Sequence, residues 1–283
     1  MATIFQLVNL KTGLALNMIN NSANQVAQLY TAQQSDAWEQ WRFLMTNTET
    51  GDFQIVNVQT GMQLSIGPWT NNNYFPVIQV PQGSTQAEWT VRPPTGSHAG
   101  QGYFEIIIPA GEESQDLTYY VMKPPLALIG TMSGGTSLGV AIEAAAGNGG
   151  QENELWSLKN SQSPPPNISF NIENAHPPGE QLGQYGGMII PIQVTNYSGP
   201  TVNLLTLPIP GTGALASSGI GFAGPTGPIS ASGGTFSTTL TITLLAGSAP
   251  SPAPEITIAA LDNNSHAIAF APISSQYWYQ NSW

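Results

Sequence analysis

One short apolar segment, Phe5–Asn9 (FQLVN), occurs three times along the chain. It returns 48 residues later as Phe53–Asn57 (FQIVN) and, more loosely, a further 51 residues on as Phe104–Ile108 (FEIII). The first two copies continue into a Thr-Gly turn, at 12–13 and 60–61, and then into a second apolar segment. This pattern predicts a strand, a turn and a strand. Self-similarity at a period near 50 residues indicates a repeat architecture.

Each copy of the segment is followed by a closing tryptophan: Trp41, Trp89 and Trp156. The distance from the opening Phe to this Trp is 36, 36 and 52 residues, so the third copy keeps the frame and holds 16 extra residues. One repeat of four short strands cannot bury its apolar face alone, whereas three repeats around an axis can. The three Trp side chains are therefore predicted to lie in a shared pseudo-threefold core.

Three repeats that open with a hydrophobic hairpin and close on x-x-Trp resemble the ricin-type (QxW) β-trefoil lectin domain. The resemblance covers about residues 1–160. The family has Gln at the first position of the closing motif, where this chain has Glu39, Ala87 and Glu154. The resemblance implies an N-terminal β-trefoil that binds carbohydrates without a metal ion or other cofactor, with galactose-type sugars as the expected ligands.

The remainder of the chain differs in composition. Residues 161–167 (SQSPPPN) are predicted to be a Pro-rich linker, and no Lys or Arg follows Lys159. Residues 168–283 contain short strand-like segments separated by turn residues, including an apolar and polar alternation over Thr235–Leu245. About seven short strands in roughly 115 residues favour an immunoglobulin-like antiparallel β-sandwich. The fold class is thus all-β, and the second domain is expected to space or oligomerise the first.

The expected strands follow directly from these patterns. In the first domain they are Phe5–Asn9, Leu14–Met18, Val26–Thr31, Phe53–Val58, Met62–Ile66, Pro76–Val80, Tyr103–Ile108, Leu117–Met122, Thr136–Glu143 and Leu155–Leu158. In the second they are Ile168–Ile172, Met188–Val194, Thr201–Leu207, Thr235–Leu245, Glu255–Leu261 and Ala267–Ala271, with Asp262–Asn264 as a hairpin turn.

Charge and cysteine content narrow the function classes. The chain has 5 Lys and Arg against 16 Asp and Glu, and the basic residues stand singly, which argues against nucleic-acid binding. It has 0 cysteines, so disulfides and thiolate sites are excluded. No apolar run approaches the ~20 residues that span a membrane, and the start lacks a signal-peptide pattern. We therefore expect a soluble protein without membrane insertion, cytoplasmic or released by a non-classical route.

The family resemblance assigns a sugar site to the first repeat. A sugar ring offers an apolar C–H face and a set of hydroxyls, so its site needs an aromatic ring and fixed polar groups. In the family the first hairpin supplies an acid or amide, the next strand supplies Gln-x-aromatic, and polar residues near the closing motif complete the ring. The matching residues in this sequence are Asn17, Gln28, Tyr30, Asp36, Trp38 and Glu39.

A candidate second site lies in the second repeat, where the hairpin and the following strand carry Ser65 and Gln79 and Pro81 replaces the aromatic. The nearby aromatic and amide residues Trp69, Asn72 and Tyr74 are its other candidate members. The third repeat has no Gln-x-aromatic match, so no site of the family's type is expected there. One or two sugars per chain are predicted.

The sequence gives little support for an enzymatic function. His98, His176 and His266 lack metal-ligand spacing, and Glu112 and Glu113 form a loop rather than a carboxylate pair for glycoside cleavage. We expect no catalytic residues and no metal site. Three alternatives remain open from the sequence: a β-trefoil protease inhibitor that acts through its loops, a toxin or pore-forming protein targeted by the trefoil, and a carbohydrate-active enzyme with a trefoil binding module. The aromatic end, Tyr277–Trp283, is expected to dock within the chain or in a homodimer formed through the second domain.

Overall fold

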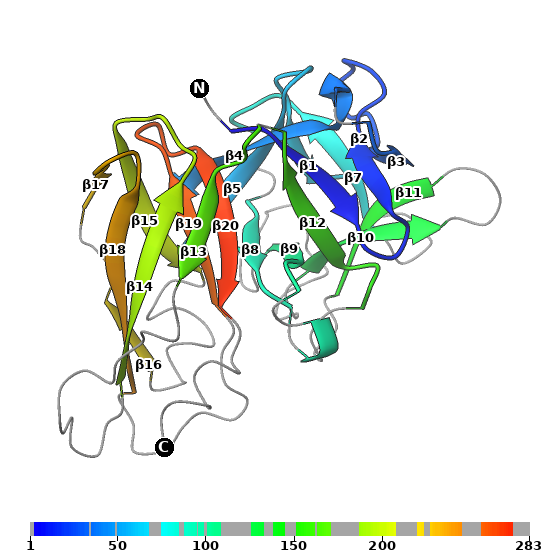
Figure 1. Ribbon diagram of the computed structural model, residues 1–283. Helices are drawn as coiled ribbons and strands as arrows, with labels where there is room; N and C mark the ends of the chain where they lie inside the picture. Colours follow the sequence, from blue (N-terminus) through cyan, green and yellow to red (C-terminus); the bar gives the residue numbers. More distant parts are fainter. Residues whose placement is uncertain are drawn as a thin grey trace. The chain divides into compact units, whose positions relative to one another are not determined.

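The computed structural model shows an all-β chain built from short antiparallel strands (Figure 1). Contact clustering divides it into two compact units, each described by itself below. One unit comprises Ile4–Thr46 and Asp52–Ser161; the other comprises Gln162–Trp283 together with Met1–Thr3 and Asn47–Gly51. The residues that the structure describes are 3–33, 35–48, 50–67, 75–84, 88–94, 96–98, 101–108, 126–132, 138–144, 151–161, 163–170, 187–207, 220–223, 227–244 and 256–273.

Six strands of the first unit close into a ring. They are β1 (Phe5–Asn9), β4 (Gln40–Asn47), β5 (Asp52–Asn57), β8 (Thr90–Arg92), β9 (Phe104–Ile108) and β12 (Leu155–Asn160). β12 pairs with β1 and β9, β1 with β4, β4 with β5, and β8 with β9. A bridge between Phe53 and Trp89 completes the circle. The strands therefore form a small closed barrel without free edges.

Three hairpin arms cover one end of this barrel. They are formed by β2 (Leu14–Asn17) with β3 (Gln28–Thr31), β6 (Gln63–Ile66) with β7 (Phe75–Val80), and β10 (Leu126–Met132) with β11 (Leu138–Ala144). The arms meet one another, since β11 pairs with β3 and β7, and Val26 bridges to Ile78. Two 3-10 turns, η1 (Ala37–Glu39) and η2 (Gly96–His98), complete the unit. A six-strand barrel closed by three hairpins is a β-trefoil, as predicted.

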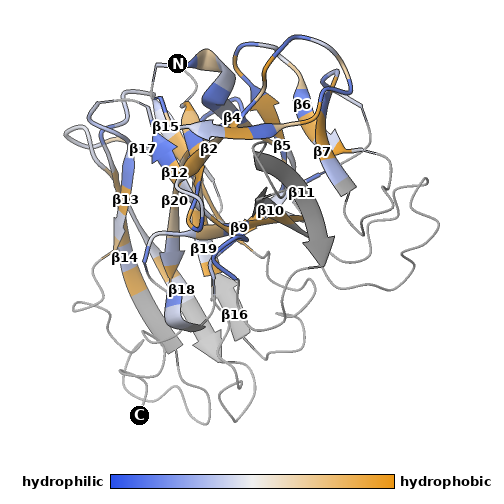
Figure 2. Cartoon of the chain, turned by 90° about the vertical axis from the view of Figure 1, so that its right-hand side faces the viewer, coloured by the Kyte–Doolittle hydropathy of each residue, from blue (hydrophilic) through white to orange (hydrophobic). Residues whose placement is uncertain are grey.

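The core repeats three times, as the sequence predicts. Equivalent residues of the three lobes are all 4% exposed or less and fall into four sets: Phe5, Phe53 and Phe104; Leu7, Ile55 and Ile106; Leu16, Leu64 and Leu128; Trp41, Trp89 and Trp156. Along β4, which Figure 2 colours by hydropathy, buried residues alternate with half-buried ones from Gln40 to Met45, so one face of this strand turns inward.

Each buried indole is bound to its own hairpin. The Nε1 groups of Trp41, Trp89 and Trp156 donate to the backbone oxygens of Leu16, Leu64 and Leu128 at 3.1, 3.2 and 2.8 Å. The donor and acceptor are 25, 25 and 28 residues apart. A buried indole N–H needs a partner, so the same bond recurs in every lobe.

Asparagines at the ends of β1 and β5 tie the first and second lobes each to the preceding lobe. Asn57 Nδ2 donates to the carbonyl of Trp38 at 2.9 Å, and Asn9 Nδ2 donates to the carbonyl of Asn153 at 2.7 Å. The Oδ1 atoms of the same residues accept from the backbone N–H groups of Thr60 and Thr12. The repeated Asn thus shapes its own turn and also holds the neighbouring lobe.

Left-handed glycines complete these turns. Gly13 and Gly61 have φ values of 68° and 66°, which a residue with a Cβ rarely adopts. Their N–H groups donate to the carbonyls of Asn9 and Asn57 at 2.9 and 3.0 Å. The Thr-Gly turn that the sequence repeats is therefore built in the same way twice.

The second unit contains two four-stranded antiparallel sheets. One has the order β13 (Asn167–Phe170), β14 (Gly187–Thr195), β18 (Phe236–Leu244) and β16 (Ile220–Ala223). The other has the order β17 (Ile229–Ser230), β15 (Thr201–Leu207), β19 (Ile256–Leu261) and β20 (Ala267–Ile273). Residues of both sheets, among them Ile192, Phe236 and Ile258, share one hydrophobic core. The unit is therefore a sandwich, and the orders β13-β14-β18 and β15-β19-β20 match the A-B-E and C-F-G order of immunoglobulin-like folds.

Most expected strands agree with the structure to within two residues, and the structure contains five strands that the sequence did not predict. β4, β8 and β10 were not foreseen, and β16 and β17 lie within a Gly, Pro and Ser-rich stretch that was not expected to form strands. In the third lobe, Leu128 on β10 takes the place of Leu16. Leu128 lies 24 positions after the opening Phe104, whereas Leu16 lies 11 positions after Phe5. The expected strand Leu117–Met122 and the aromatic end Tyr277–Trp283 lie outside the described residues. Among the residues that the structure describes, no helix has the length and apolar character needed to cross a membrane.

Replacing Trp89 by Phe should lower the free energy of unfolding of the trefoil by about 2–4 kcal/mol, because it leaves a void and removes the donor to the Leu64 carbonyl. Chemical unfolding followed by circular dichroism would measure the loss. The exposed Lys11→Ala is the control and should change the free energy by less than about 0.5 kcal/mol. Equal stability of Trp89→Phe and the native chain would contradict the assigned role of the indole N–H.

Candidate functional site

The polar cluster of the first lobe is built around the short turn η1. Asp36 is its N-cap, and Asp36 Oδ1 accepts from the backbone N–H of Trp38 at 3.0 Å. The carbonyl of Trp38 accepts from the backbone N–H of Met18 at 3.1 Å and from Asn57 Nδ2. The turn is therefore fixed from both sides, which holds Asp36 beside the end of β2.

Asn17 and Glu39 meet Asp36 within this cluster. Asn17 is 5% exposed, and its Nδ2 lies 3.5 Å from Asp36 Oδ2 and 3.4 Å from Glu39 Oε1. Both carboxylates attract the amide hydrogens, which leaves the Asn17 amide oxygen as an acceptor. A sugar hydroxyl that donates to this oxygen would find it held in one orientation.

Glu39 is the most buried member of the cluster. It is 1% exposed, and its Oε2 accepts from Gln6 Nε2 and from the backbone N–H of Gln33, both at 2.7 Å. Neither Gln6 nor Gln33 is among the residues that the family resemblance assigned to the site. The signal for Gln6 was its position in the repeated segment, where the other lobes carry Gln54 and Glu105.

Gln28 and Tyr30 lie on the outward face of β3. Gln28 pairs with Asn17 across the hairpin and is half-buried, whereas Tyr30 is 46% exposed. The cross-strand partner of Tyr30 is Ala15, whose methyl group can cover little of the phenol ring. The structure thus brings together an exposed aromatic, an amide beside it, and the Asn17–Asp36 cluster, while Trp38 is half-buried on η1 and fixed through its backbone.

The second-lobe candidates are placed differently. Ser65 and Gln79 are both 0% exposed, and Ser65 is paired with Ile78, as Asn17 is with Gln28. Gln79 Nε2 donates to the carbonyls of Asn20 and Ser22, both at 2.7 Å, so its side chain holds a loop of the first lobe. Trp69, Asn72 and Tyr74 lie outside the described residues.

Residues 2–80 match the ricin-type beta-trefoil lectin domain-like family. This match confirms the predicted ricin-type lectin-like domain at the N-terminus, and it spans the whole first-lobe cluster. Comparison of the sequence with curated proteins finds no match.

Solved structures that the chain resembles include further β-trefoils. A designed 3-fold symmetric protein, ThreeFoil, is 19% identical with a TM-score of 0.41, and the match covers 55% of this chain and 96% of the ThreeFoil chain. The BEL beta-trefoil is 12% identical with a TM-score of 0.40, over 56% and 92% of the two chains. A cytolethal distending toxin from Actinobacillus actinomycetemcomitans is 14% identical with a TM-score of 0.38, over 55% and 89%. The trefoil assignment rests on the strand pairing described above.

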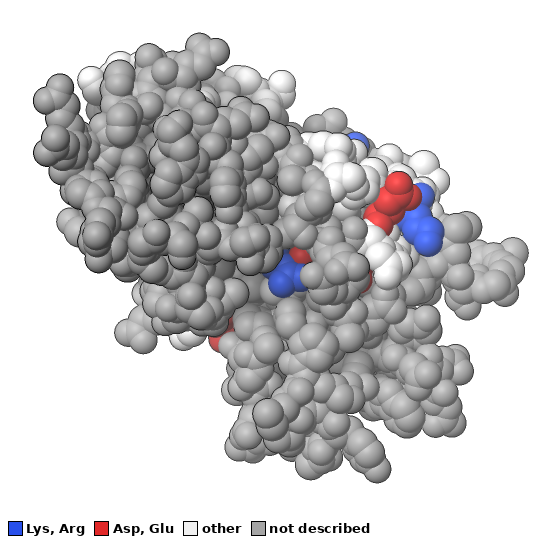
Figure 3. Space-filling view, turned by 90° about the horizontal axis from the view of Figure 1, so that it is seen from below, with Lys and Arg blue, Asp and Glu red and all other residues white. Residues whose placement is uncertain are grey.

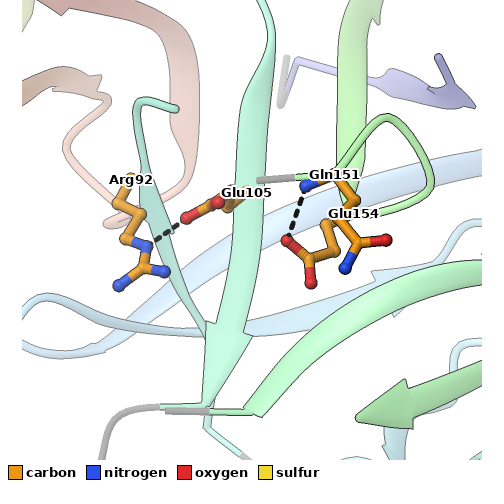
Figure 4. A network of polar contacts seen from close by, with 4 residues as sticks. All are labelled: Arg92, Glu105, Gln151 and Glu154. Carbon is orange, nitrogen blue, oxygen red and sulfur yellow. Dashed lines mark hydrogen bonds and ion pairs between the residues drawn. The ribbon is translucent and has the colours of Figure 1, made fainter. Parts of the chain in front are cut away.

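In the third lobe of the trefoil, two acids occupy the places of Gln6 and Glu39. Figure 4 shows Glu105 between Arg92 and Glu154. Glu105 and Glu154 are 1% and 0% exposed, and Arg92 Nε is bound to Glu105 Oε2. Glu154 Oε2 accepts from the backbone N–H of Gln151 at 2.9 Å. Burial raises the pKa of Glu105, and the Glu154 carboxylate adds to the rise, while Arg92 opposes it.

Charge is sparse on the described surface. On the face drawn in Figure 3, the described acidic and basic side chains are few, and the basic ones form no patch. Within the described segments, no three His, Asp or Glu side chains gather in a way that would hold a metal ion. His266 follows the Asn263–Ser265 turn, with its Nδ1 at 3.4 Å from Asp262 Oδ2, and His176 lies outside the described residues.

Glu105→Gln should flatten the dependence of trefoil stability on pH. Because its folded-state pKa is raised above the ordinary value of 4.5, the folded domain binds this proton more tightly than the unfolded chain does. The resulting stabilisation is present below pH 4.5 and is lost as pH rises through the folded-state pKa. Thermal unfolding between pH 4.5 and 7 should therefore show a smaller decline in the variant.

The variant and the native protein are compared by the slope of stability against pH, because loss of the Arg92 partner shifts the variant's stability at every pH. Glu152→Gln in the neighbouring exposed turn makes the same change of charge and should keep the native slope. Parallel curves for Glu105→Gln and the native protein would contradict the assignment.

Proposed function

We propose that this protein is a lectin that binds a neutral sugar at the first lobe of its ricin-type domain. The observation that carries the proposal is the 46% exposed Tyr30 next to Gln28 and the fixed Asn17–Asp36 cluster. The ring would stack on the C–H face of the sugar. Gln28, the Asn17 amide oxygen and Asp36 would meet its hydroxyls. Glu39 positions Asn17, and Trp38 would border the site.

Galactose-type sugars are the ligands that the family resemblance suggests. Asp36 and the buried Glu39 place negative charge at the site, which disfavours acidic sugars such as uronates. We propose binding without turnover, so that a bound glycan is recovered chemically unchanged.

The C-terminal sandwich is proposed to pair two chains and so to make weak sites act together. Its sequence after Lys159 holds no Lys or Arg, and a surface of low charge loses little on burial. Mass measurement of the full chain in solution tests this point and decides whether the protein can cross-link glycoconjugates.

Tyr30→Ala should weaken glycan binding at least about tenfold, because the stacked ring is lost, while Tyr30→Phe should retain most of the affinity. A glycan array followed by titration of the best ligand would measure both. The adjacent exposed Thr31→Ala is the matched control and should bind as the native protein does.

Two outcomes would redirect the proposal. Binding that persists in Tyr30→Ala would move the site away from the first lobe. Failure of the native protein to bind any glycan would reject the lectin function, and inhibition of a protease panel would then be the next test.

A further inference from the structure

The first sheet of the sandwich presents an outer face without charged groups. Its inward residues, among them Ile192, Val194 and Phe236, are 2% exposed or less and lie in the shared core. The residues that alternate with them point outward. β13, β14 and β18 contain no Asp, Glu, Lys or Arg. Among the described side chains of these strands, the exposed ones, which we call the polar face, are Asn167, Ser169, Gln193, Ser237 and Thr239.

Cross-strand pairing makes the polar face continuous. Ser169 pairs with Gln193, and Gln193 pairs with Ser237, so one residue from each strand forms a row. Asn167 and Thr239 extend the face along β13 and β18, because alternate residues of a strand share a face. Paired residues of neighbouring antiparallel strands have side chains close enough to touch. The polar face is therefore one surface, carried by strands whose inner side is fixed in the core.

A second copy of this chain is the partner that these groups fit. Ser and Thr hydroxyls and Asn and Gln amides each donate and accept hydrogen bonds. In a twofold pair the same surface lies on both chains, so groups with both roles can bind their own copies, whereas a charged group near the axis would meet its own sign. The chain has a formal net charge of -11, so a face without acids is where a second copy meets the least repulsion.

The second sheet leaves no comparable face free along its described strand β19. Ile256 and Ile258 lie in the shared core and are 0% and 1% exposed. Thr257 and Ala259 point the other way, and both are also 0% exposed. β19 is therefore buried on both faces within a single chain. The polar face of the first sheet, rather than the outer side of β19, is open to a partner.

The size of the first sheet limits the strength of the pairing. Its four strands contain 4, 9, 9 and 4 residues. At about 3.3 Å per residue and about 4.8 Å between strands, the sheet offers roughly 400 Å² to a partner. This area is about half of what each partner buries in a complex of standard size, so pairing should be weak and should grow with concentration. Chains held by their trefoils on a glycan surface reach a high local concentration, where a weak contact suffices.

We propose that the polar face binds the same face of a second copy of this chain. This inference rests on the proposed pairing of two chains through the sandwich and names the surface that forms it. Hydrogen bonds between hydroxyl and amide groups replace those that each face makes with water, and no charge has to be buried. The contact contains no residue of the proposed sugar site, so a single chain keeps its affinity for a soluble sugar.

Gln193→Glu tests the surface, because it changes an amide to a carboxylate with little change in shape. Sedimentation equilibrium of the full chain from micromolar to millimolar concentration would measure the dissociation constant of the pair. The variant should raise this constant at least about tenfold, since each face would bury an unpaired charge. Gln82→Glu, in an exposed turn of the trefoil, makes the same chemical change and should keep the native value.

Ser237→Asp, on the neighbouring strand, is a second variant of the polar face and should also weaken pairing. Circular dichroism would check that both variants keep the native fold. Native dissociation constants in both variants, or a native chain that stays monomeric at millimolar concentration, would overturn the assigned surface. Titration with a soluble sugar tests the lectin function separately. Sugar binding by a monomeric chain would keep that function and reject the pairing, whereas paired chains without sugar binding would do the reverse.

Discussion

The first unit depends on three hydrogen bonds from buried indoles to leucine carbonyls. Trp41, Trp89 and Trp156 each fill the barrel and also hold the hairpin that covers it. Packing alone would allow the arms to slide over the barrel, because apolar contact is not directional. A buried N–H that must find an acceptor removes that freedom. The same bond in each lobe therefore fixes the geometry on which every loop of the trefoil is carried.

The lobes are joined by a second set of polar contacts that is not equally distributed. Asn9 and Asn57 hold the closing segments of the preceding lobes, whereas the third lobe has Ile108 at the equivalent position. The same lobe replaces the Gln6–Glu39 pair by two acids, Glu105 and Glu154, which need Arg92 beside them. The pseudo-threefold plan is thus most regular in the lobes that do not carry the insertion.

The candidate site uses the face that the core leaves free. On β3, Leu29 turns inward while Gln28 and Tyr30 turn outward, so one strand both packs the core and carries part of the candidate site. Gln79 illustrates how the lobes cooperate. It belongs to the second lobe, yet its side chain binds the loop between β2 and β3 of the first. The loop beside the candidate site is therefore held by residues of two lobes.

The sequence by itself determined the repeat, the all-β class, the core positions and the Thr-Gly turns, because these follow from local periodicity and backbone preference. The family resemblance, rather than a local pattern, predicted that Asn17, Gln28, Tyr30 and Asp36 belong to one candidate site. Tertiary structure alone decided that Gln6 supports Glu39, that Gln79 serves the first lobe, and that β10 lies beyond a long insertion. Those contacts join residues far apart in the chain, or depend on a loop length that shifts the register, and no local pattern encodes either.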